Sequence, residues 1–191
     1  MLVRPASPAI HLEQENHDSN QNPVDPDPAA GRGLSLAVTG LAQLLFPWQA
    51  NGSQLTDSKQ QLIGSALLGQ KFERADYFHP RPSASDFNTI GGSASNLGMS
   101  SPLRAEFAEQ AAKAQPESSS PAMLTRSASG LDPHLPLDAV LAQVDRVARE
   151  RGLDPAQLTE QVKSATQAGI LGPQVVNILQ LNLQLDHQKG A

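Results

Sequence analysis

The stretch Thr125–Leu153 reads TRSASGLDPHLPLDAVLAQVDRVARERGL, and it joins a turn of small residues to the strongest helical pattern in the chain. The apolar residues of its second half recur every three or four positions, which places them on one face of a helix. That face contains Leu137, Val140, Leu141, Val144, Val147 and Ala148, whereas Gln143, Asp145, Arg146, Arg149 and Glu150 lie off it. We therefore predict one amphipathic helix that stops at Gly152.

The turn before this helix carries the residue types of a loop that contacts anions. Ser127 and Ser129 offer hydroxyl groups, and Gly130 can expose its backbone N–H. The same residues are equally typical of an ordinary turn. Because so short a motif is a weak signal, composition alone favours the ordinary turn.

The sequence after the central helix predicts another helix and a strand. Asp154 is a suitable N-cap, and Pro155 a suitable first residue, for a helix that runs to about residue 167. Beyond it, leucines alternate with polar residues over 176–185, as they do in a half-buried strand. We predict an α+β (mixed α/β) fold, with a small sheet and about three helices in one compact soluble domain, preceded by a short hydrophobic helix.

The composition limits the classes of function. The chain has 191 residues, a net charge of -5 and no cysteine. An acidic chain without a basic run argues against a nucleic-acid partner, because phosphate binding needs clustered lysines and arginines. The lack of cysteine excludes disulfides, thiol nucleophiles and cysteine-based zinc sites. The five histidines are scattered, without the spacing of a helical zinc site, so we expect no metal.

Two segments precede the soluble domain, for which we expect residues 47–191. Residues 1–32 are polar, proline-rich and acidic, and they predict a disordered tail. Residues 33–46 are free of charge and predict a hydrophobic helix of roughly 21 Å, shorter than the roughly 30 Å hydrocarbon core of a bilayer. Pro47 ends that helix, and Trp48 suits either a membrane–water boundary or a protein core.

The segment Tyr77–Ala84 reads YFHPRPSA, and its two prolines predict an extended backbone. Four side chains along it, those of Tyr77, His79, Arg81 and Ser83, could form a docking surface. Together with the tryptophan described above, they are our candidates for partner contacts. Nucleophilic catalysis by the histidine and the serine is less favoured, because such a pair needs a third group that orients the imidazole.

Local patterns complete the expected fold. We expect a short strand within residues 61–72, a long loop over residues 85–102, a helix that starts at Pro102, and a strand over residues 122–126. A loop of that length is uncommon in a compact domain unless it binds something, so it is a candidate contact surface, with a flexible linker as the alternative.

Several strings that occur in order along the chain resemble the C subunit of the Kdp-type potassium-transporting P-type ATPase. They span residues 36–186 and include FPWQANGS (46–53), GSALLGQKF (64–72), YFHPRPSA (77–84), SNLG (95–98), SASGLDPH (127–134), QVDRVARERGL (143–153) and VNILQLNLQLD (176–186). Ordered matches of this number are far more specific than any single motif in the chain.

This resemblance implies a non-catalytic accessory subunit of an ATP-driven, high-affinity potassium uptake complex in the bacterial inner membrane. The family's C subunit has one N-terminal transmembrane helix and a soluble domain, and it is described as raising the ATP affinity of the catalytic subunit. The implied partners are the catalytic and the potassium-channel-like subunits of the same pump. ATP, held together with the catalytic subunit, is the implied ligand.

The resemblance also assigns candidate residues. For a nucleotide contact they are Ser127, Ser129, Gly130 and Gln143. Family members extend the hydrophobic helix on its N-terminal side, whereas residues 11–32 of this chain are polar and acidic. We therefore expect residues 33–46, a shortened counterpart of the transmembrane helix, to give weak or partner-dependent membrane association. The alternative hypothesis is a soluble extracytoplasmic ligand-binding domain or small enzyme.

Overall fold

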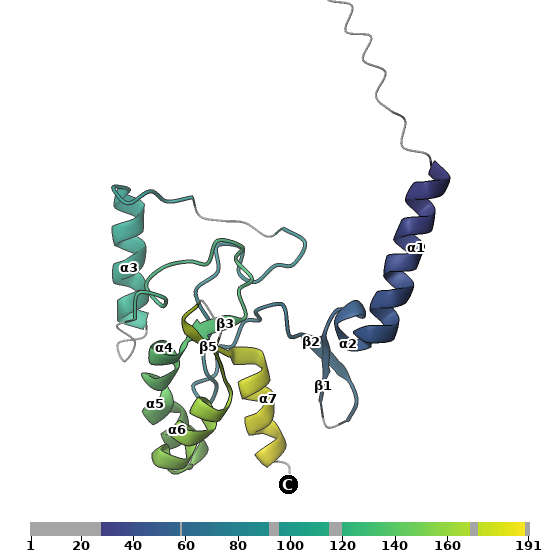
Figure 1. Cartoon of the computed structure of the whole chain (residues 1–191). Coiled ribbons are helices and arrows are strands. Elements are labelled where there is room, and N and C mark those ends of the chain that lie inside the picture. The colour runs from purple at the N-terminus through teal and green to yellow at the C-terminus, as the bar shows by residue number, and fades with distance from the viewer. Residues whose placement is uncertain (1–27, 58, 92–95, 115–119, 169–171, 190–191) are drawn as a thin grey trace, which may run out of the picture. The chain divides into compact units, whose positions relative to one another are not determined.

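The computed structural model describes residues 28–57, 59–91, 96–114, 120–168 and 172–189 of the chain (Figure 1). It has a mixed α/β fold with small sheets, which confirms the predicted fold class, and it contains more helices than the three we expected. The chain divides into two compact units, Met1–Ala42 and Gln43–Ala191, which are described here separately.

The first unit contains most of helix α1, Pro28–Leu45. This helix includes residues 33–45 of the predicted hydrophobic segment but begins before residue 33. The rest of the predicted tail, residues 1–27, lies outside the described residues. The 18 residues of the helix give a length of about 27 Å. More than half of the surface is exposed on each of its large apolar side chains, Leu34, Leu36, Val38, Leu41, Leu44 and Leu45. Across the described ranges, no helix has both the length and the apolar character that a bilayer crossing requires.

The second unit begins with a one-turn helix and a hairpin. Helix α2, Pro47–Ala50, starts at a proline, whose fixed φ suits the first helical position. Strands β1, Gln54–Thr56, and β2, Leu62–Ser65, pair antiparallel. The strand predicted within residues 61–72 is therefore confirmed only in its first part, because the chain then turns to bond elsewhere: the N–H of Gly69 donates to the carbonyl oxygen of Leu131 at 2.8 Å.

A three-stranded antiparallel sheet lies in the centre of this unit. Strand β5, Gln174–Asn177, is the middle strand, between β3, His134–Pro136, and β4, Thr166–Ala168. The strand that we predicted over residues 122–126 is wrong, because these residues form turns. The hydroxyl of Thr125 donates to the carbonyl oxygen of Pro121 at 2.8 Å, so this side chain closes a local turn.

Four helices accompany that sheet: α4, Leu137–Leu141; α5, Val144–Arg151; α6, Pro155–Ser164; and α7, Ile178–Lys189. Figure 1 shows the first three in green beside α7 in yellow. The core is formed by facing side chains of these helices, by residues of the sheet, and by Phe78 and Met123 of the preceding loops. Its fully buried large members include Phe78, Leu135, Val140, Val147, Leu158, Val162, Val176, Ile178, Leu181 and Leu185.

The central amphipathic helix is interrupted. Residues 142 and 143 form a turn between α4 and α5, so the single predicted helix is two. Gln143, which we placed off the apolar face, has no exposed surface, and that assignment is wrong. The predicted stop is confirmed: Gly152 caps α5 with a φ of 68°, a left-handed conformation that glycine adopts without strain.

The predicted strand over residues 176–185 is wrong beyond Asn177. Helix α7 replaces it, and its buried residues are Ile178, Leu179, Leu181, Asn182 and Leu185. The last four of these residues lie one, three, four and seven positions after Ile178, which is the spacing of one face of a helix. The alternating leucines fit a period of two as well, and leucine and glutamine are good helix formers, so packing on the core decides between the two structures.

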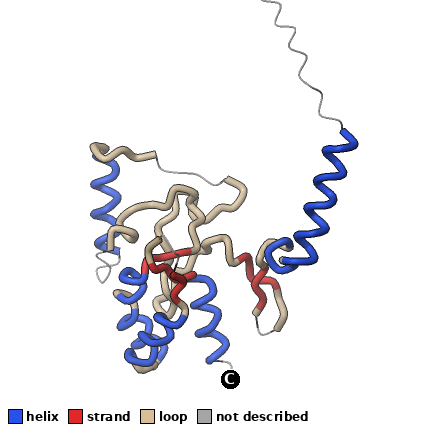
Figure 2. The backbone as a smooth tube through the Cα atoms, viewed as in Figure 1, coloured by secondary structure: helices blue, strands red, loops and turns tan. Residues whose placement is uncertain are grey.

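Two other helices start where the sequence predicts. The Oδ1 atom of Asp154 accepts a hydrogen bond from the N–H of Ala156 at 3.2 Å, which confirms the cap of α6. Helix α3, Pro102–Ala114, begins at the predicted proline but buries none of its residues. Figure 2 shows that the chain between β2 and β3 is otherwise loop, coloured tan, in its described residues.

Candidate functional site

The Tyr77–Ala84 segment crosses the helices without joining a sheet. Phe78 has no exposed surface and Pro80 is buried, so the backbone between them is shielded from water. A buried backbone group without a hydrogen bond costs free energy, so the N–H and C=O groups of this segment need partners. Side chains of the helices supply them.

Asn182 on α7 pairs with both backbone groups of Phe78. Its Oδ1 atom accepts from the N–H of Phe78 at 2.9 Å, and its Nδ2 atom donates to the carbonyl oxygen of Phe78 at 2.9 Å. The asparagine is only 1% exposed. Its amide therefore bonds to the segment much as the backbone of a neighbouring strand would.

Gln143, in the turn between α4 and α5, does the same for the next residue. Its Oε1 atom accepts from the N–H of His79 at 2.8 Å, and its Nε2 atom donates to the carbonyl oxygen of His79 at 3.1 Å. The same nitrogen lies 3.3 Å from the carbonyl oxygen of Ala139. The sequence held a signal for this burial, because residue 143 lies three positions after Val140 and four before Val147 on the apolar face.

Two arginines of α5 donate hydrogen bonds to the backbone carbonyl groups just before Phe78. Arg146 donates from Nη1 to the carbonyl oxygens of Ala75 and Tyr77, and from Nη2 to the Oε1 atom of Gln143 at 2.7 Å. Arg151 donates from Nε to the carbonyl oxygen of residue 76. The carbonyl groups of five consecutive residues, 75–79, thus all accept hydrogen bonds from side chains of α5, its N-cap and α7.

Three side chains, those of Asp186, Arg74 and Arg151, contact the Tyr77 side chain. Its hydroxyl donates to Asp186 at 2.8 Å, and its ring centroid lies 5.2 Å from the guanidinium carbon of Arg74 and 4.8 Å from that of Arg151. Burial, followed by the hydrogen bond to the carboxylate of Asp186, raises the pKa of the tyrosine hydroxyl. The tyrosine therefore stays neutral beyond its usual range and keeps donating.

The pKa of the neighbouring Asp76 carboxyl group shifts in the opposite direction. Burial alone would raise the pKa of Asp76, but the hydrogen bond and the charge of Arg74 outweigh burial and lower this pKa. Arg74 binds the carboxylate through both Nε, at 2.9 Å, and Nη2. Because the guanidinium group of Arg74 also contacts the Tyr77 ring, this ion pair is part of the group of side chains around the tyrosine.

The other candidate side chains of the segment also bond within the fold. The Nε2 atom of His79 lies 3.1 Å from the carbonyl oxygen of Arg74. Arg81 forms an ion pair with Asp132 at 3.3 Å. The Oγ atom of Ser83 accepts from the N–H of residue 87 at 3.0 Å. The histidine and the serine therefore bond to different neighbours, and the segment is less free for docking than its sequence indicates.

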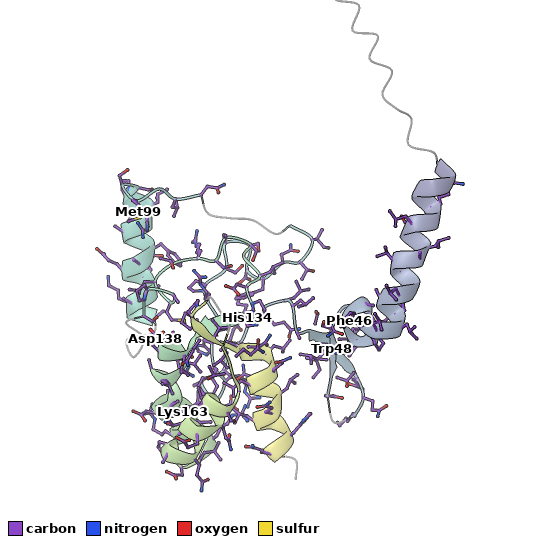
Figure 3. All side chains as sticks on the ribbon, in the orientation of Figure 1. Phe46, Trp48, Met99, His134, Asp138 and Lys163 are labelled. Atoms are coloured by element: carbon purple, nitrogen blue, oxygen red, sulfur yellow. The ribbon has the colours of Figure 1, made fainter. Side chains whose placement is uncertain are left out.

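Trp48 is more open than these side chains. It is 47% exposed, and its indole N–H donates to the carbonyl oxygen of Gln54 at 3.1 Å. Phe46, just before α2, is 57% exposed, and Figure 3 labels both rings. An aromatic pair with this exposure is a candidate contact for a partner or a lipid surface.

The residues predicted to contact a nucleotide form a tight turn. The N–H of Ser127 donates to the carbonyl oxygen of Pro82 at 3.2 Å, and the hydroxyl of Ser129 accepts from the N–H of Leu131 at 3.1 Å. Gly130 has a φ of 73°. The bond of Ser129 to Leu131 and the φ of Gly130 are features of an ordinary turn, whereas the bond of Ser127 joins this turn to the distant Pro82. A nucleotide contact by these three residues and Gln143 stays a prediction.

Two hollows lie near these elements. An open one of about 520 Å³ is lined by Lys71, Phe72, Glu73, Arg74 and Tyr77. A smaller one of about 240 Å³ lies between α3 and the turns before β3, and its lining is Leu97, Met99, Arg104, Phe107, Leu124, Thr125 and Arg126. Figure 3 labels Met99 in the loop before α3. Among the residues that the structure describes, no group of three or more histidine, aspartate or glutamate side chains could hold a metal ion.

Comparison with known proteins shows the family to which this sequence is similar. Residues 30–187 match the family described as "K+-transporting ATPase, c chain" (KdpC). The chain is 46% identical over 159 residues to the potassium-transporting ATPase KdpC subunit of Pseudomonas aeruginosa PAO1, which covers 81% of this chain and 87% of the relative. It is 45% identical to the subunit of Myxococcus xanthus, covering 81% and 79%, and 48% identical to that of Pseudomonas putida W619, covering 78% and 84%.

Proposed function

Because this chain belongs to the KdpC family, the c chain of K+-transporting ATPases, we propose that it is an accessory subunit of an ATP-driven potassium uptake pump. In this role it stabilises the complex, is not catalytic itself, and raises the affinity of the catalytic subunit for ATP. Its partners are the catalytic and the potassium-channel-like subunits. The pump works in the inner membrane of a bacterium.

One observation carries this proposal. The family match extends over residues 30–187, so it includes both the hydrophobic helix α1 and the domain that follows, and the relatives are covered over most of their own length. A match of that extent supports a role for the chain as a whole subunit rather than as a single module.

The candidate site supports an accessory role through its chemistry. The charged and polar groups around Tyr77 are paired with one another: Asp186 with the tyrosine and Arg151, and Arg74 with Asp76. Groups used in this way fix a shape, whereas a general acid or base needs a free proton site that faces a substrate. The exposed ring of Trp48 offers contact area for a partner.

For ATP, we propose that this chain acts on the nucleotide site of the catalytic subunit. A direct contact would come from the turn with Ser127, Ser129 and Gly130, where the exposed hydroxyl of Ser129 would donate to the anionic ligand. For the membrane, we propose that α1 associates weakly or only together with partner helices, because all its large apolar side chains are exposed in this chain alone.

Co-purification with the pump subunits tests the proposal. We expect an affinity-tagged chain to bring down the catalytic and channel-like subunits, and a pump that lacks it to show a higher KM for ATP. The purified chain alone should hydrolyse no ATP. Failure to co-purify, or substrate turnover by the chain alone, would instead support a soluble extracytoplasmic enzyme or ligand-binding domain.

A further inference from the structure

We infer that the hollow between α3 and the turns before β3 is a binding site for an aliphatic anion, that is, a hydrocarbon chain that ends in a carboxylate or phosphate group. Arg104 and Arg126 bind the charged end, and the apolar residues beside them cover the chain. This inference goes beyond the proposed function and does not depend on it, because the site is formed by residues of this chain alone.

One face of α3 supplies half of this hollow. Arg104, Phe107, Ala108 and Ala111 are half-buried, and they follow one another at the spacing of a helix face. The guanidinium carbon of Arg126, in the turns opposite, lies 4.2 Å from the centroid of the Phe107 ring. The helix therefore meets the turns through an arginine and an aromatic ring, and about 240 Å³ of space remains beside this contact.

The fold does not neutralise the charge of the two arginines. The Nη1 atom of Arg104 lies 2.6 Å from the Sδ atom of Met99, which is a neutral and weak acceptor. Arg126 lies over a neutral ring, and its buried Nε atom bonds to no group that the structure describes. Glu106 lines an adjoining hollow together with Arg126, yet among the described residues neither arginine forms an ion pair. An anion is thus the ligand that best complements this end of the hollow.

The other end of the hollow is apolar. A second space of about 360 Å³ adjoins the first, because the two share the lining residues Met99, Arg104, Leu124 and Thr125. The rest of its lining consists of small residues, which are Ser101, Ala105, Ala108 and Pro121. A mostly apolar hollow with a few polar groups at one point orients its ligand. The arrangement therefore fits a ligand with an anionic end and an aliphatic chain.

The methyl group of Met99 is a local probe for this site. The chain has three methionines, and Met123, 2% exposed, provides a reference in the core. The full chain, with isotope-labelled methionine methyl groups, would be titrated with hexanoate in the presence of phosphatidylcholine nanodiscs, which shield α1 without adding net charge. Met99→Leu assigns the signal.

We expect hexanoate to shift the Met99 signal in a saturable way and the Met123 signal much less. Hexanoate should bind about fifteenfold more tightly than butanoate, since each buried methylene contributes about fourfold. The uncharged hexanamide should bind at least about tenfold more weakly than hexanoate. The absence of a shift at Met99, or equal affinities for all three ligands, would overturn the inference.

Substitution of the arginines tests the charged end. Arg104→Gln and Arg126→Gln should each weaken the binding of hexanoate by about tenfold, because each removes a charge-assisted hydrogen bond, and should leave hexanamide nearly unaffected. Arg149→Gln, at an exposed arginine of α5, is the matched control and should bind hexanoate as the wild type does. An equal loss for hexanoate and hexanamide would contradict the role of the two arginines.

Substitution of an alanine tests the apolar end. Ala108→Leu fills the space beside α3 and should abolish the advantage of hexanoate over butanoate. Ala112→Leu, at an exposed position of the same helix, should keep this advantage. If Ala108→Leu binds hexanoate as tightly as the wild type does, the chain does not enter this space and the inference fails.

Further ligands distinguish the source of the anion. Saturation of the Met99 shift by hexanoate or hexyl phosphate supports a free aliphatic anion. Saturation by dihexanoyl phosphatidylglycerol alone supports the same site with a lipid headgroup as its ligand. A shift caused by ATP and by none of these compounds would overturn the inference.

Discussion

Two neighbouring stretches, the Tyr77–Ala84 segment and the described residues of the loop that follows it (85–91 and 96–101), lie outside the sheets, yet they differ in burial. Phe78 in the first has no exposed surface, whereas Ile90 in the second is 97% exposed and Met99 is 85% exposed. The difference arises from helices far along the chain, which supply hydrogen bonds to the first stretch. A loop can therefore be as fixed as a strand where side chains replace the partner strand.

The largest effect expected from this difference concerns Phe78. Phe78→Ala should lower the free energy of unfolding by about 3–5 kcal/mol, because it empties a fully packed site. Ile90→Ala, the matched change in the exposed loop, should alter it by less than about 0.5 kcal/mol. Urea unfolding of both variants measures this, and equal losses would show that the two stretches are alike.

The next effect concerns the hydrogen bonds rather than the packing. Asn182→Leu keeps a side chain of similar size but leaves two backbone groups of Phe78 buried without partners, which should cost about 2–4 kcal/mol. Gln184→Leu on the same helix is the control and should be close to neutral. If both substitutions have the same small effect, the amide does not hold the segment.

A smaller effect is expected at Tyr77. Tyr77→Phe removes the hydrogen bond to Asp186 and should cost about 1 kcal/mol at neutral pH. The raised pKa means that the folded state holds the hydroxyl proton more tightly than the unfolded state. This stabilisation is complete below the ordinary pKa of 10.0 and is lost as the pH rises through the folded-state value.

This pH dependence has a direct optical test. Tyr77 is the chain's one tyrosine, so the absorbance of tyrosinate reports this residue alone. The titration midpoint should lie above 10.0 in the folded chain and return to about the ordinary value in urea. A folded midpoint at or below 10.0 would contradict both the burial of this hydroxyl and its hydrogen bond to Asp186.

The smallest effect is expected at Lys71, which precedes the Tyr77–Ala84 segment and forms an ion pair with the loop that follows it. Lys71 pairs with Glu73 and with Asp86, at 3.0 Å in each case, and all three side chains are exposed. Exposed pairs contribute little, so Lys71→Met should leave the denaturation midpoint unchanged within error, at low and at high salt. A clear loss would show that the following loop is also held in place.

Local signals in the sequence were sufficient for some elements. The cap Asp154, the following Pro155 and the terminal Gly152 act within a few residues, so the C-terminal end of α5 and the start of α6 could be predicted closely. The fold class and the family resemblance also followed from the sequence, since both depend on patterns that run along the whole chain.

Long-range pairing was not available from the sequence. Gln143 bonds to His79, 64 positions away, and this long-range pairing helps to explain why a polar residue is fully buried. The alternating leucines of α7 satisfy two periods, and contacts with the core select the helical one. The turns at residues 121–125 depend on a side-chain hydrogen bond that propensity does not reveal.

Hydrogen exchange at backbone amides tests the central claim most directly. The N–H groups of Phe78 and His79 bond to buried side-chain amides, whereas that of Ile90 bonds to an exposed asparagine. In the full chain we predict that the first two exchange only with opening of the folded core, and that the amide of Ile90 exchanges near the unprotected rate. Rapid exchange at Phe78 and His79 would contradict the claim that helical side chains hold this segment.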